Sequence, residues 1–206
     1  MRIEIKKSIK PVNYLKAIKF LEKRLDQISK NKAKELIWIL EHPSTYTSGN
    51  VLDKKDILDN SIKIIKTSRG GKITWHGPGQ IVCYLVINLN NIKKNIRNFL
   101  NIIESSIINT LKEFGINSYA DRKNIGIWVN TKSGEKKIAA IGIKIKKWIT
   151  FHGFSININN DLNYYKKIIP CGIKNKGVTN LNEIKKQNYK RIKNIIIKNL
   201  ILNFKI

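Results

Sequence analysis

The stretch that decides the fold is IGIWVNTKSGEKKIAAIGIKI, residues 125–145. Two apolar segments, 125–129 and 138–145, lie on either side of Ser133-Gly134, and two short apolar runs joined by a glycine-containing turn predict a β-hairpin. Residues 154–158 then alternate between apolar and polar side chains, as a strand does. The centre of the sequence therefore predicts a β-sheet.

Working outward, two further apolar runs predict strands at 35–40 (ELIWIL) and 81–89, the second preceded by a break at Pro78-Gly79. Helices are predicted at 12–29, 92–114 and 189–203, because apolar residues recur there every three or four positions. In the first helix this apolar face comprises Leu15, Ile18, Leu21, Leu25 and Ile28, and in the second Ile96, Phe99, Leu100, Ile103, Ile107 and Leu111. Gly115 follows the second helix where a C-terminal cap is expected. Strands clustered between helices predict an α+β fold, a mixed central sheet flanked by helices.

Composition predicts one globular domain over residues 1–206, since 42% of the residues are hydrophobic and no linker interrupts the chain. The formal charge of +26, from 40 Lys+Arg against 14 Asp+Glu, raises a nucleic-acid-binding module as one alternative. Only 6 of the 40 basic residues are Arg, whose planar fork is better suited to reading bases, and no nucleic-acid motif supports that alternative. We expect the excess Lys to be spread over the surface.

The N-terminal sequence, the length of the apolar runs and the two cysteines predict a cytoplasmic protein. The stretch from Met1 to Pro11 alternates Lys and Ile without an apolar core, unlike a secretory signal, and the longest uncharged apolar run, 81–87, is too short to span a membrane. Cys83 lies inside an apolar run and is expected to be an inert core residue. Cys171 lies between Pro170 and Gly172, where a thiol can be exposed and reactive.

Three segments mix reactive residue types with sharp turns. The first, SRGGKITWHGPGQ at 68–80, contains four glycines and presents Arg69 and His76 at bends. The second, KKIAAIGIKI at 136–145, starts with Lys137 and continues with small residues that leave room for a ligand or for another backbone segment. The third, IIPCGIKNKGVTNL at 168–181, contains Cys171. Together they indicate covalent catalysis by Cys171.

Other site chemistries lack support in the sequence. His42, His76 and His152 do not have the spacing of a metal-ligand cluster, so we expect no metal. The glycine-rich stretch does not end in Gly-Lys-Ser/Thr, as a phosphate-binding Walker loop would, and it does not have the dinucleotide-binding spacing. We expect no cofactor.

With these segments assembled, the chain closely resembles the bacterial lipoyl(octanoyl) transferase family. Glu41-His42-Pro43 with Tyr46-Thr47 and Gly49 is similar to the family's EHP-x-x-YT-x-G stretch, and residues 69–80 to its RGG-x-x-T-x-HGPGQ signature. Three further motifs match in family order: KIA-x-IG at 137–142, His152-Gly153-Phe154 with Asn157, and Pro170-Cys171-Gly172-Ile173 with Val178-Thr179. Trp75 and Ser155 depart slightly from the usual residues. The motifs span 41–181, most of the chain.

The resemblance implies a biotin/lipoate ligase-like fold and an octanoyl transferase with Cys171 as acyl-accepting nucleophile and Lys137 as its partner. It also implies an acyl-binding tunnel formed by Arg69, Gly70, Gly71, Lys72, Ile73, Thr74, Trp75, His76, Ala140, Ile141, Gly142, Gly153, Phe154 and Ser155. The implied donor is octanoyl-acyl carrier protein. The implied acceptors are lysines in lipoyl domains of 2-oxoacid dehydrogenase E2 subunits and in the glycine-cleavage H protein.

Several alternatives stay open. His76 can position the thioester, orient Lys137, join a hydrogen-bond network or only stabilise the Gly-Pro-Gly bend. An ATP-dependent lipoate or octanoate ligase of the same fold is the nearest rival, although it needs no cysteine nucleophile. An amidotransferase shares the thiol chemistry but takes its acyl group from a modified protein. An inactive relative is disfavoured because both Cys171 and Lys137 are retained.

Overall fold

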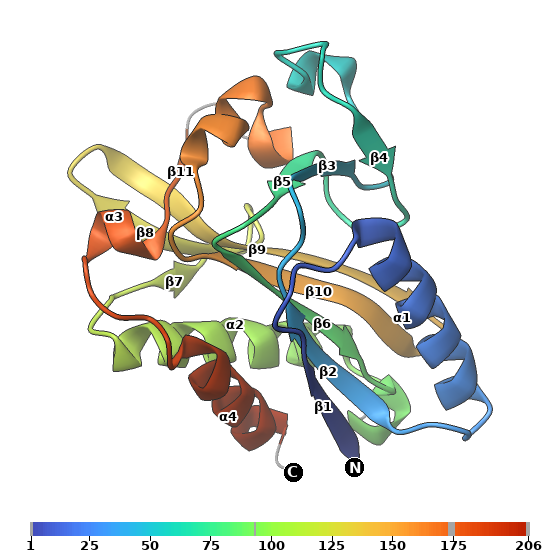
Figure 1. Ribbon diagram of the computed structural model, residues 1–206. Coiled ribbons are helices and arrows are strands. Elements are labelled where there is room, and N and C mark those ends of the chain that lie inside the picture. Colours follow the sequence, from blue (N-terminus) through green and yellow to red (C-terminus); the bar gives the residue numbers. More distant parts are fainter. Residues whose placement is uncertain (1, 93, 173–175, 205–206) are drawn as a thin grey trace.

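The computed structural model describes residues 2–92, 94–172 and 176–204. Its centre is a mixed sheet in the order β1-β2-β6-β10-β9-β8-β7, with β11 paired to β9 (Figure 1). The β1–β2 and β11–β9 pairs are parallel, and the other neighbours in this sheet are antiparallel. The strands are β1 (Ile3–Lys7), β2 (Glu35–Leu40), β6 (Gln80–Val86), β7 (Tyr119–Ala120), β8 (Ile127–Thr131), β9 (Gly134–Lys146), β10 (Ile149–Asn157) and β11 (Gly177–Val178).

Helices cover both faces of this sheet (Figure 1). Helix α1 (Tyr14–Ser29) packs on one face, against β6 and β10, while α2 (Ile96–Glu113) and α4 (Ile192–Phe204) pack together on the other. Both faces of strand β2 are buried, which explains why it is apolar after Glu35: Leu36, Trp38 and Leu40 face α1, and Ile37 and Ile39 face α2 and α4. Each such side chain contributes about 1.5–3 kcal/mol when it is fully buried.

A second, smaller sheet in the order β4-β3-β5 lies beside one end of the main sheet (Figure 1). Its strands are β3 (Thr45–Ser48), β4 (Ile64–Lys66) and β5 (Thr74–His76). Short helical segments complete the chain: η1 (Lys54–Asp56), η2 (Leu89–Ile92), η3 (Leu162–Lys167), η4 (Pro170–Gly172) and α3 (Leu181–Ile184). A bridge between Ile57 and Ile168 ties the segment after η1 to the one that leads into η4.

The predicted α+β class and mixed sheet are confirmed, as are the strand at 35–40, the hairpin across Ser133-Gly134 and the three long helices. Gly115 has a φ of 70° just after α2, as its predicted capping role requires. The predicted face of α1 was partly wrong. Leu15 is 58% exposed, and the buried positions are Tyr14, Ala17, Leu21, Leu25 and Ile28, which also recur every three or four residues.

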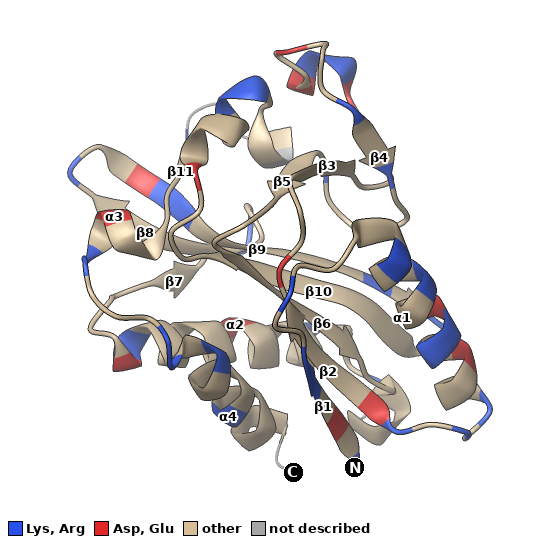
Figure 2. Cartoon of the chain, in the orientation of Figure 1, with Lys and Arg blue, Asp and Glu red and all other residues tan. Residues whose placement is uncertain are grey.

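Basic residues are spread widely over the described surface. Figure 2 shows Lys and Arg on α1, α2 and α4 and on many of the loops, with no one element holding them all. This distribution agrees with the expectation that the excess Lys is not a single nucleic-acid patch. Within the described ranges, no helix has both the length and the apolar character needed to cross a membrane.

Candidate active site

A cavity of about 60 Å³ lies over β6, β10 and β9, on the face that α1 covers. The cavity extends along β10, and the pairing of β10 with β9 and β6 shows which residues lie at each point of it. At one end Ser155 pairs with Ala140, and two residues along β10 Gly153 pairs with Gly142. Val82 and Tyr84 of β6 stand beside Ser155 and Gly153, respectively. The cavity is lined by Tyr14, Arg69, Gly70, Gly71, Lys72, Thr74, His76, Val82, Tyr84, Ala140, Ile141, Gly142, His152, Gly153, Phe154 and Ser155.

Two of the three segments singled out from the sequence, 68–80 and 136–145, line this cavity, as do most of the predicted tunnel residues. Ile73 and Trp75 do not, because side chains alternate along β5: Thr74 and His76 face the cavity, while Ile73 and Trp75 are buried in the core beneath the small sheet. Trp75 stacks on Tyr164 with ring centroids 4.6 Å apart. Ile73 and Trp75 thus pack on the side of this segment that faces away from the cavity.

Sequence reasoning missed four lining residues: Tyr14, Val82, Tyr84 and His152. Tyr84 and Val82 are two residues apart in a strand whose alternate positions share a face, which is the signal that could have placed them. Tyr14 carried a comparable signal, since it lies three residues before Ala17 on the buried face of α1. His152 was quoted as part of a motif, but nothing in its spacing showed that its ring would reach the cavity.

The loop that carries Arg69 packs unusually close to the sheet. The Gly70 amide donates to the Ile143 carbonyl at 3.2 Å, and a Cβ added to Gly142 would come within 3.2 Å of the Gly70 oxygen. A Cβ at Gly153 would collide with the Cys83 carbonyl oxygen. Both glycines line the cavity, and both also allow backbone segments to approach each other, which is one of the two reasons expected for small residues in this sheet.

A buried hydrogen-bond network surrounds His76. Its Nδ1 lies 2.7 Å from the Gln80 Oε1, and because this amide oxygen can only accept, Nδ1 donates. The Gln80 amide in turn donates to Asn157 at 2.9 Å and to the Tyr165 hydroxyl at 2.8 Å. Burial lowers the pKa of His76 to about 3, so the ring is neutral and its Nε2 is left as an acceptor.

The other two histidines lie close by. His42 Nδ1 donates to the Val12 carbonyl at 2.6 Å and its Nε2 accepts from the Tyr84 hydroxyl at 2.7 Å. Ring centroids lie 5.8 Å apart between His42 and His76, and 6.4 Å apart between Tyr84 and His152. Burial lowers the pKa of His42 to about 4 and that of His152 to about 3. Three histidines that are far apart in sequence thus share one neutral, buried cluster.

Lys137 is a buried cation at the Ser155 end of this site. Its side chain is largely enclosed, Nζ donates to the Ile125 carbonyl at 3.0 Å, and Nζ lies 4.9 Å from the centre of the Trp128 ring. Among the described residues, no carboxylate lies within ion-pair distance of this ammonium. A buried charge normally has a counter-ion, so this position suits an anion supplied by something else.

The segment that contains Cys171 runs past Lys137. Val178 pairs with Lys137 in the β11–β9 ladder, and Pro170 lines the same small cavity of about 10 Å³ as Lys137, Thr74 and Ser155. The side chain of Cys171 lies outside the described part of the structure, as does Ile173, so its pairing with Lys137 stays a prediction. Cys83 is fully buried in β6 and burial raises the pKa of its thiol, which confirms it as an inert core residue.

Lys72 is a second cation near this turn. It pairs with Asp56 at 3.2 Å and lies against Gly172, which has a φ of 68°. The Ile169 amide donates to the Asp56 carbonyl at 2.8 Å, so the same aspartate anchors both the lysine and the chain that leads into η4. These contacts hold the η4 backbone beside the cavity.

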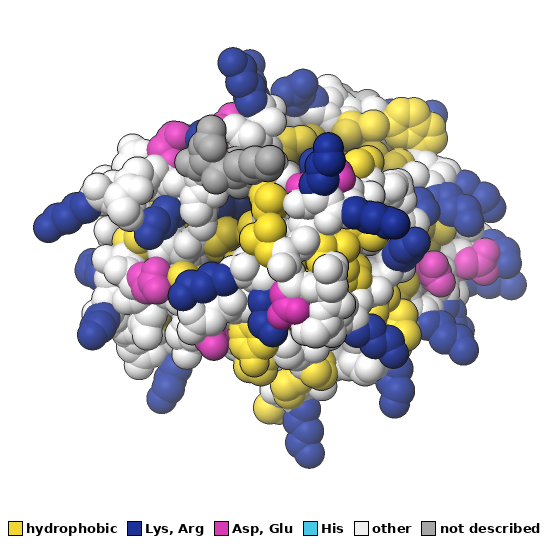
Figure 3. Space-filling model, turned by 90° about the horizontal axis from the view of Figure 1, so that it is seen from above, with side chains coloured by type: hydrophobic (Ala, Val, Ile, Leu, Met, Phe, Trp, Pro, Cys, Tyr) yellow, Lys and Arg dark blue, Asp and Glu magenta, His cyan; other side chains and the backbone are white. Residues whose placement is uncertain are grey.

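Larger hollows also open on the surface. A groove of about 450 Å³ runs from Lys137 along Ile141, Ile143 and Ile145 to Ile96 and Leu100 of α2, and it shares Gly70, Gly71 and Gly142 with the central cavity. Figure 3 looks onto the end of the molecule that carries the small sheet, and shows hydrophobic side chains near its centre with Lys and Arg around them. Lys and Arg predominate over Asp and Glu around this apolar surface, and a net positive surface suits an acidic partner.

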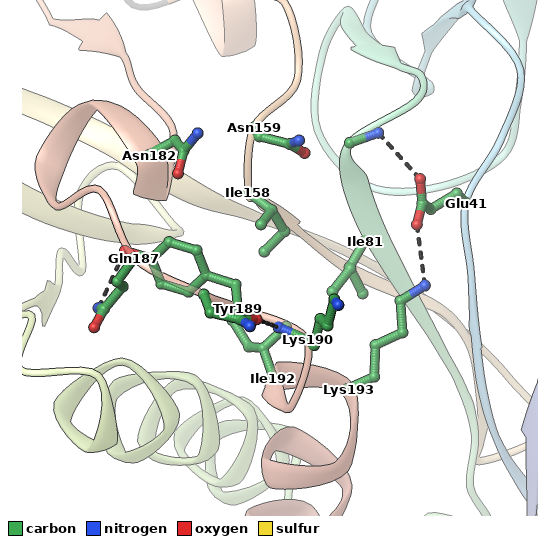
Figure 4. Close-up of a pocket in the computed structure, with 12 residues that line it drawn as sticks. Glu41, Ile81, Ile158, Asn159, Asn182, Gln187, Tyr189, Lys190, Ile192 and Lys193 are labelled. Carbon is green, nitrogen blue, oxygen red and sulfur yellow. Dashed lines mark hydrogen bonds and ion pairs between the residues drawn. The ribbon is translucent and has the colours of Figure 1, made fainter.

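A second hollow, of about 550 Å³, lies away from Lys137, between α4 and the bend at Gly79 (Figure 4). Glu41 lines this hollow and accepts two hydrogen bonds, from the Gly79 amide at 3.0 Å and from the Lys193 ammonium at 3.0 Å. The Glu41 side chain thus ties α4 to the bend after His76, and we assign this groove a structural role.

Comparison with known proteins adds independent findings. The profile of the lipoyl protein ligase A/B catalytic domain matches residues 13–201. An octanoyltransferase from Wolbachia sp. subsp. Brugia malayi (strain TRS) is 46% identical over 174 residues, which cover 84% of this chain and 85% of the relative. An octanoyltransferase from Anaplasma phagocytophilum (strain HZ) is 42% identical and covers 91% of each chain.

Solved structures agree on the fold. A putative lipoate protein ligase from T. acidophilum with bound lipoic acid superposes with a TM-score of 0.70 at 15% identity, covering 99% of this chain and 86% of that one. The biotin protein ligase of Aquifex aeolicus gives a TM-score of 0.54 at 14% identity, with 99% and 69% covered. At such identities the likeness shows the fold alone, and it confirms the expected biotin/lipoate ligase-like architecture.

Proposed function

Because the chain belongs to the lipoyl protein ligase A/B catalytic domain family, we propose that it is an octanoyltransferase acting through a cysteine thioester. The donor is octanoyl-acyl carrier protein, the thioester forms on Cys171, and the acceptors are lipoyl-domain lysines of 2-oxoacid dehydrogenase E2 subunits and of the glycine-cleavage H protein. Residues 1–206 act as one catalytic domain in the cytoplasm, without metal or cofactor. The relatives at 42–46% identity carry this activity in their names.

One observation carries the mechanistic part of the proposal. Lys137 is a buried ammonium that no carboxylate neutralises among the described residues, and it lines the same small cavity as Pro170, the residue before Cys171. A thiolate at residue 171 would supply the missing anion. An adjacent ammonium favours the thiolate form of a cysteine, which is the reactive form.

In the first half-reaction the Cys171 thiolate attacks the thioester carbon of the donor. A new C–S bond forms and the old one breaks. The carrier thiolate leaves and takes a proton from the Lys137 ammonium, which becomes a neutral amine. One thioester replaces another, so the step is close to thermoneutral. The acyl chain lies in the central cavity, bounded by the 69–76 segment and by residues 140–142 and 153–155.

In the second half-reaction the acceptor lysine attacks the acyl-enzyme through its neutral amine. Lys137, left as a neutral amine by the first half-reaction, accepts the proton that the incoming amine must lose. An amide forms, the C–S bond breaks, and the Cys171 thiolate is regenerated beside Lys137. His76 keeps a supporting role, since its neutral ring is hydrogen-bonded to Gln80 at the cavity wall.

The rivals differ in their donors. An ATP-dependent ligase would activate free octanoate or lipoate, and an amidotransferase would take the acyl group from an already modified protein. The resemblance to ligase structures does not favour the ligase, since it lies at 12–19% identity for the lipoate ligases and shows only the fold.

The test is a three-donor assay that follows the mass of an apo lipoyl domain. The donors are octanoyl-acyl carrier protein without ATP, octanoate with ATP, and an octanoylated H protein. We expect octanoylation with the first donor alone. Turnover only with octanoate and ATP would establish the ligase, and turnover only with the octanoylated protein would establish the amidotransferase.

A further inference from the structure

His152 is the most isolated polar group next to the central cavity. Its side chain is 2% exposed, and neither ring nitrogen has a hydrogen-bond partner among the described residues. It also has a φ of 68°, unusual for a residue other than glycine, within strand β10. Buried polar groups nearly always have partners, so an orphaned imidazole at a cavity wall points to a partner that enters the cavity.

Among the described residues, the neighbours of His152 do not supply that partner. The ring stacks on Phe151, with centroids 4.6 Å apart, and the nearby Tyr84 hydroxyl already donates to His42. The pKa of His152 is lowered to about 3 by burial and by the charges of Arg69 and Lys144, so the ring is neutral, with one donor and one acceptor. The cavity of about 60 Å³ has room for a few water molecules that could bind both nitrogens.

The position of His152 along the cavity matches the length of the acyl chain. Ser155 lines both this cavity and the small cavity at Lys137, so it marks the end where the thioester is proposed to form. His152 lies three residues further along β10, which corresponds to roughly 10 Å. An extended chain of eight carbons, with bonds of about 1.5 Å, spans roughly 9 Å. Its terminal methyl therefore stops just before the imidazole.

We propose that His152 sets the upper limit of acyl chain length, because a longer chain would strip its ring of hydrogen-bonded water. This inference rests on the proposed function. Burying two more methylenes favours binding by roughly 15-fold. Leaving two buried polar atoms without partners costs roughly 30-fold or more. The second effect is larger, so a decanoyl chain is rejected although it is more hydrophobic.

The test compares octanoyl- and decanoyl-acyl carrier protein as donors and measures kcat/KM for acylation of the enzyme. Wild type, His152→Leu and His152→Gln are assayed, with Gln as the matched control because it keeps a donor and an acceptor. We expect His152→Leu to raise the decanoyl-to-octanoyl ratio about tenfold or more, and His152→Gln to leave it within threefold. The ratio is taken within one protein, so differences in folded fraction cancel.

An unchanged ratio in a folded His152→Leu protein would overturn the inference, as would an equal rise in His152→Gln. If the Leu variant does not fold, His152→Met replaces it, since Met is apolar and adapts to irregular space. Failure of the proposed function looks different, because wild type itself would then take no octanoyl group from the carrier.

Discussion

Acidification should destabilise this protein well above the pH at which its carboxylates titrate. Burial lowers the pKa of His42 to about 4, and that of His76 and His152 to about 3. In the unfolded chain each histidine titrates near 6.5. The unfolded state therefore binds more protons below this pH, and the stability from the neutral buried rings is complete above pH 6.5 and is lost progressively as the pH falls.

The magnitude follows from these values. At pH 5.0, 1.5 units below the ordinary histidine pKa, each ring that stays neutral in the folded state costs about 2 kcal/mol of stability, or about 6 kcal/mol for three. This is a large part of the 5–15 kcal/mol typical of a domain. Glu35 and Glu104 act in the opposite direction, since burial raises the pKa of both carboxyls. The expected net loss is therefore somewhat below about 6 kcal/mol.

The assay is urea unfolding at pH 7.5 and 5.0 at fixed ionic strength, followed by tryptophan fluorescence. The variant His152→Gln removes one of the three titrating groups, so its loss between the two pH values should be about 2 kcal/mol smaller than that of wild type. A wild-type loss below about 2 kcal/mol, which is the contribution of a single ring, would refute the conclusion that the three rings are buried and neutral. An equal loss in the variant would refute it for His152.

Three further predictions concern single side chains. Lys137→Met should lower the rate of enzyme acylation by at least ~100-fold in stopped-flow mixing with the octanoyl donor, because the cation that favours the thiolate is lost. Its melting temperature should stay close to that of wild type, and an acylation rate within tenfold of wild type would contradict the role of Lys137. Gly153→Ala should destabilise by about 1–3 kcal/mol in urea unfolding, since the new Cβ would collide with the Cys83 carbonyl oxygen; a neutral effect would contradict the close approach of β10 and β6. Leu21→Ala should cost about 2–5 kcal/mol and Leu15→Ala less than about 0.5 kcal/mol in the same experiment, because only the first is buried; the reverse order would contradict the observed face of α1.

The parts of the fold that the sequence predicted well are those whose pattern is local. The apolar run at 35–40 became β2 because both its faces are buried, and the Ser133-Gly134 turn joins two antiparallel strands. The small sheet was missed because its strands are only 3–4 residues long and depend on pairing between distant segments. For short strands, propensity is weaker than tertiary context.

The candidate site also has parts that local sequence patterns predicted and parts that they did not. The segments around Arg69, Lys137 and Gly153 were recognised from their motifs, and the structure brings them to one cavity or its immediate edge. Their backbone contacts were not foreseeable, since the collision that a Cβ at Gly153 would cause involves a neighbouring strand. The gathering of His42, His76 and His152 is also set by the packing of distant segments, which no spacing in the sequence encodes.

The central claim is that Cys171 carries the acyl group, and intact-protein mass spectrometry tests it most directly. Wild type, Cys171→Ala and Cys83→Ala are mixed with octanoyl-acyl carrier protein in the absence of acceptor, and each is weighed before and after hydroxylamine treatment. The account predicts one octanoyl group on wild type and on Cys83→Ala, removed by hydroxylamine, and none on Cys171→Ala. A gain that persists in Cys171→Ala, or no gain in wild type with an intact donor, would contradict it.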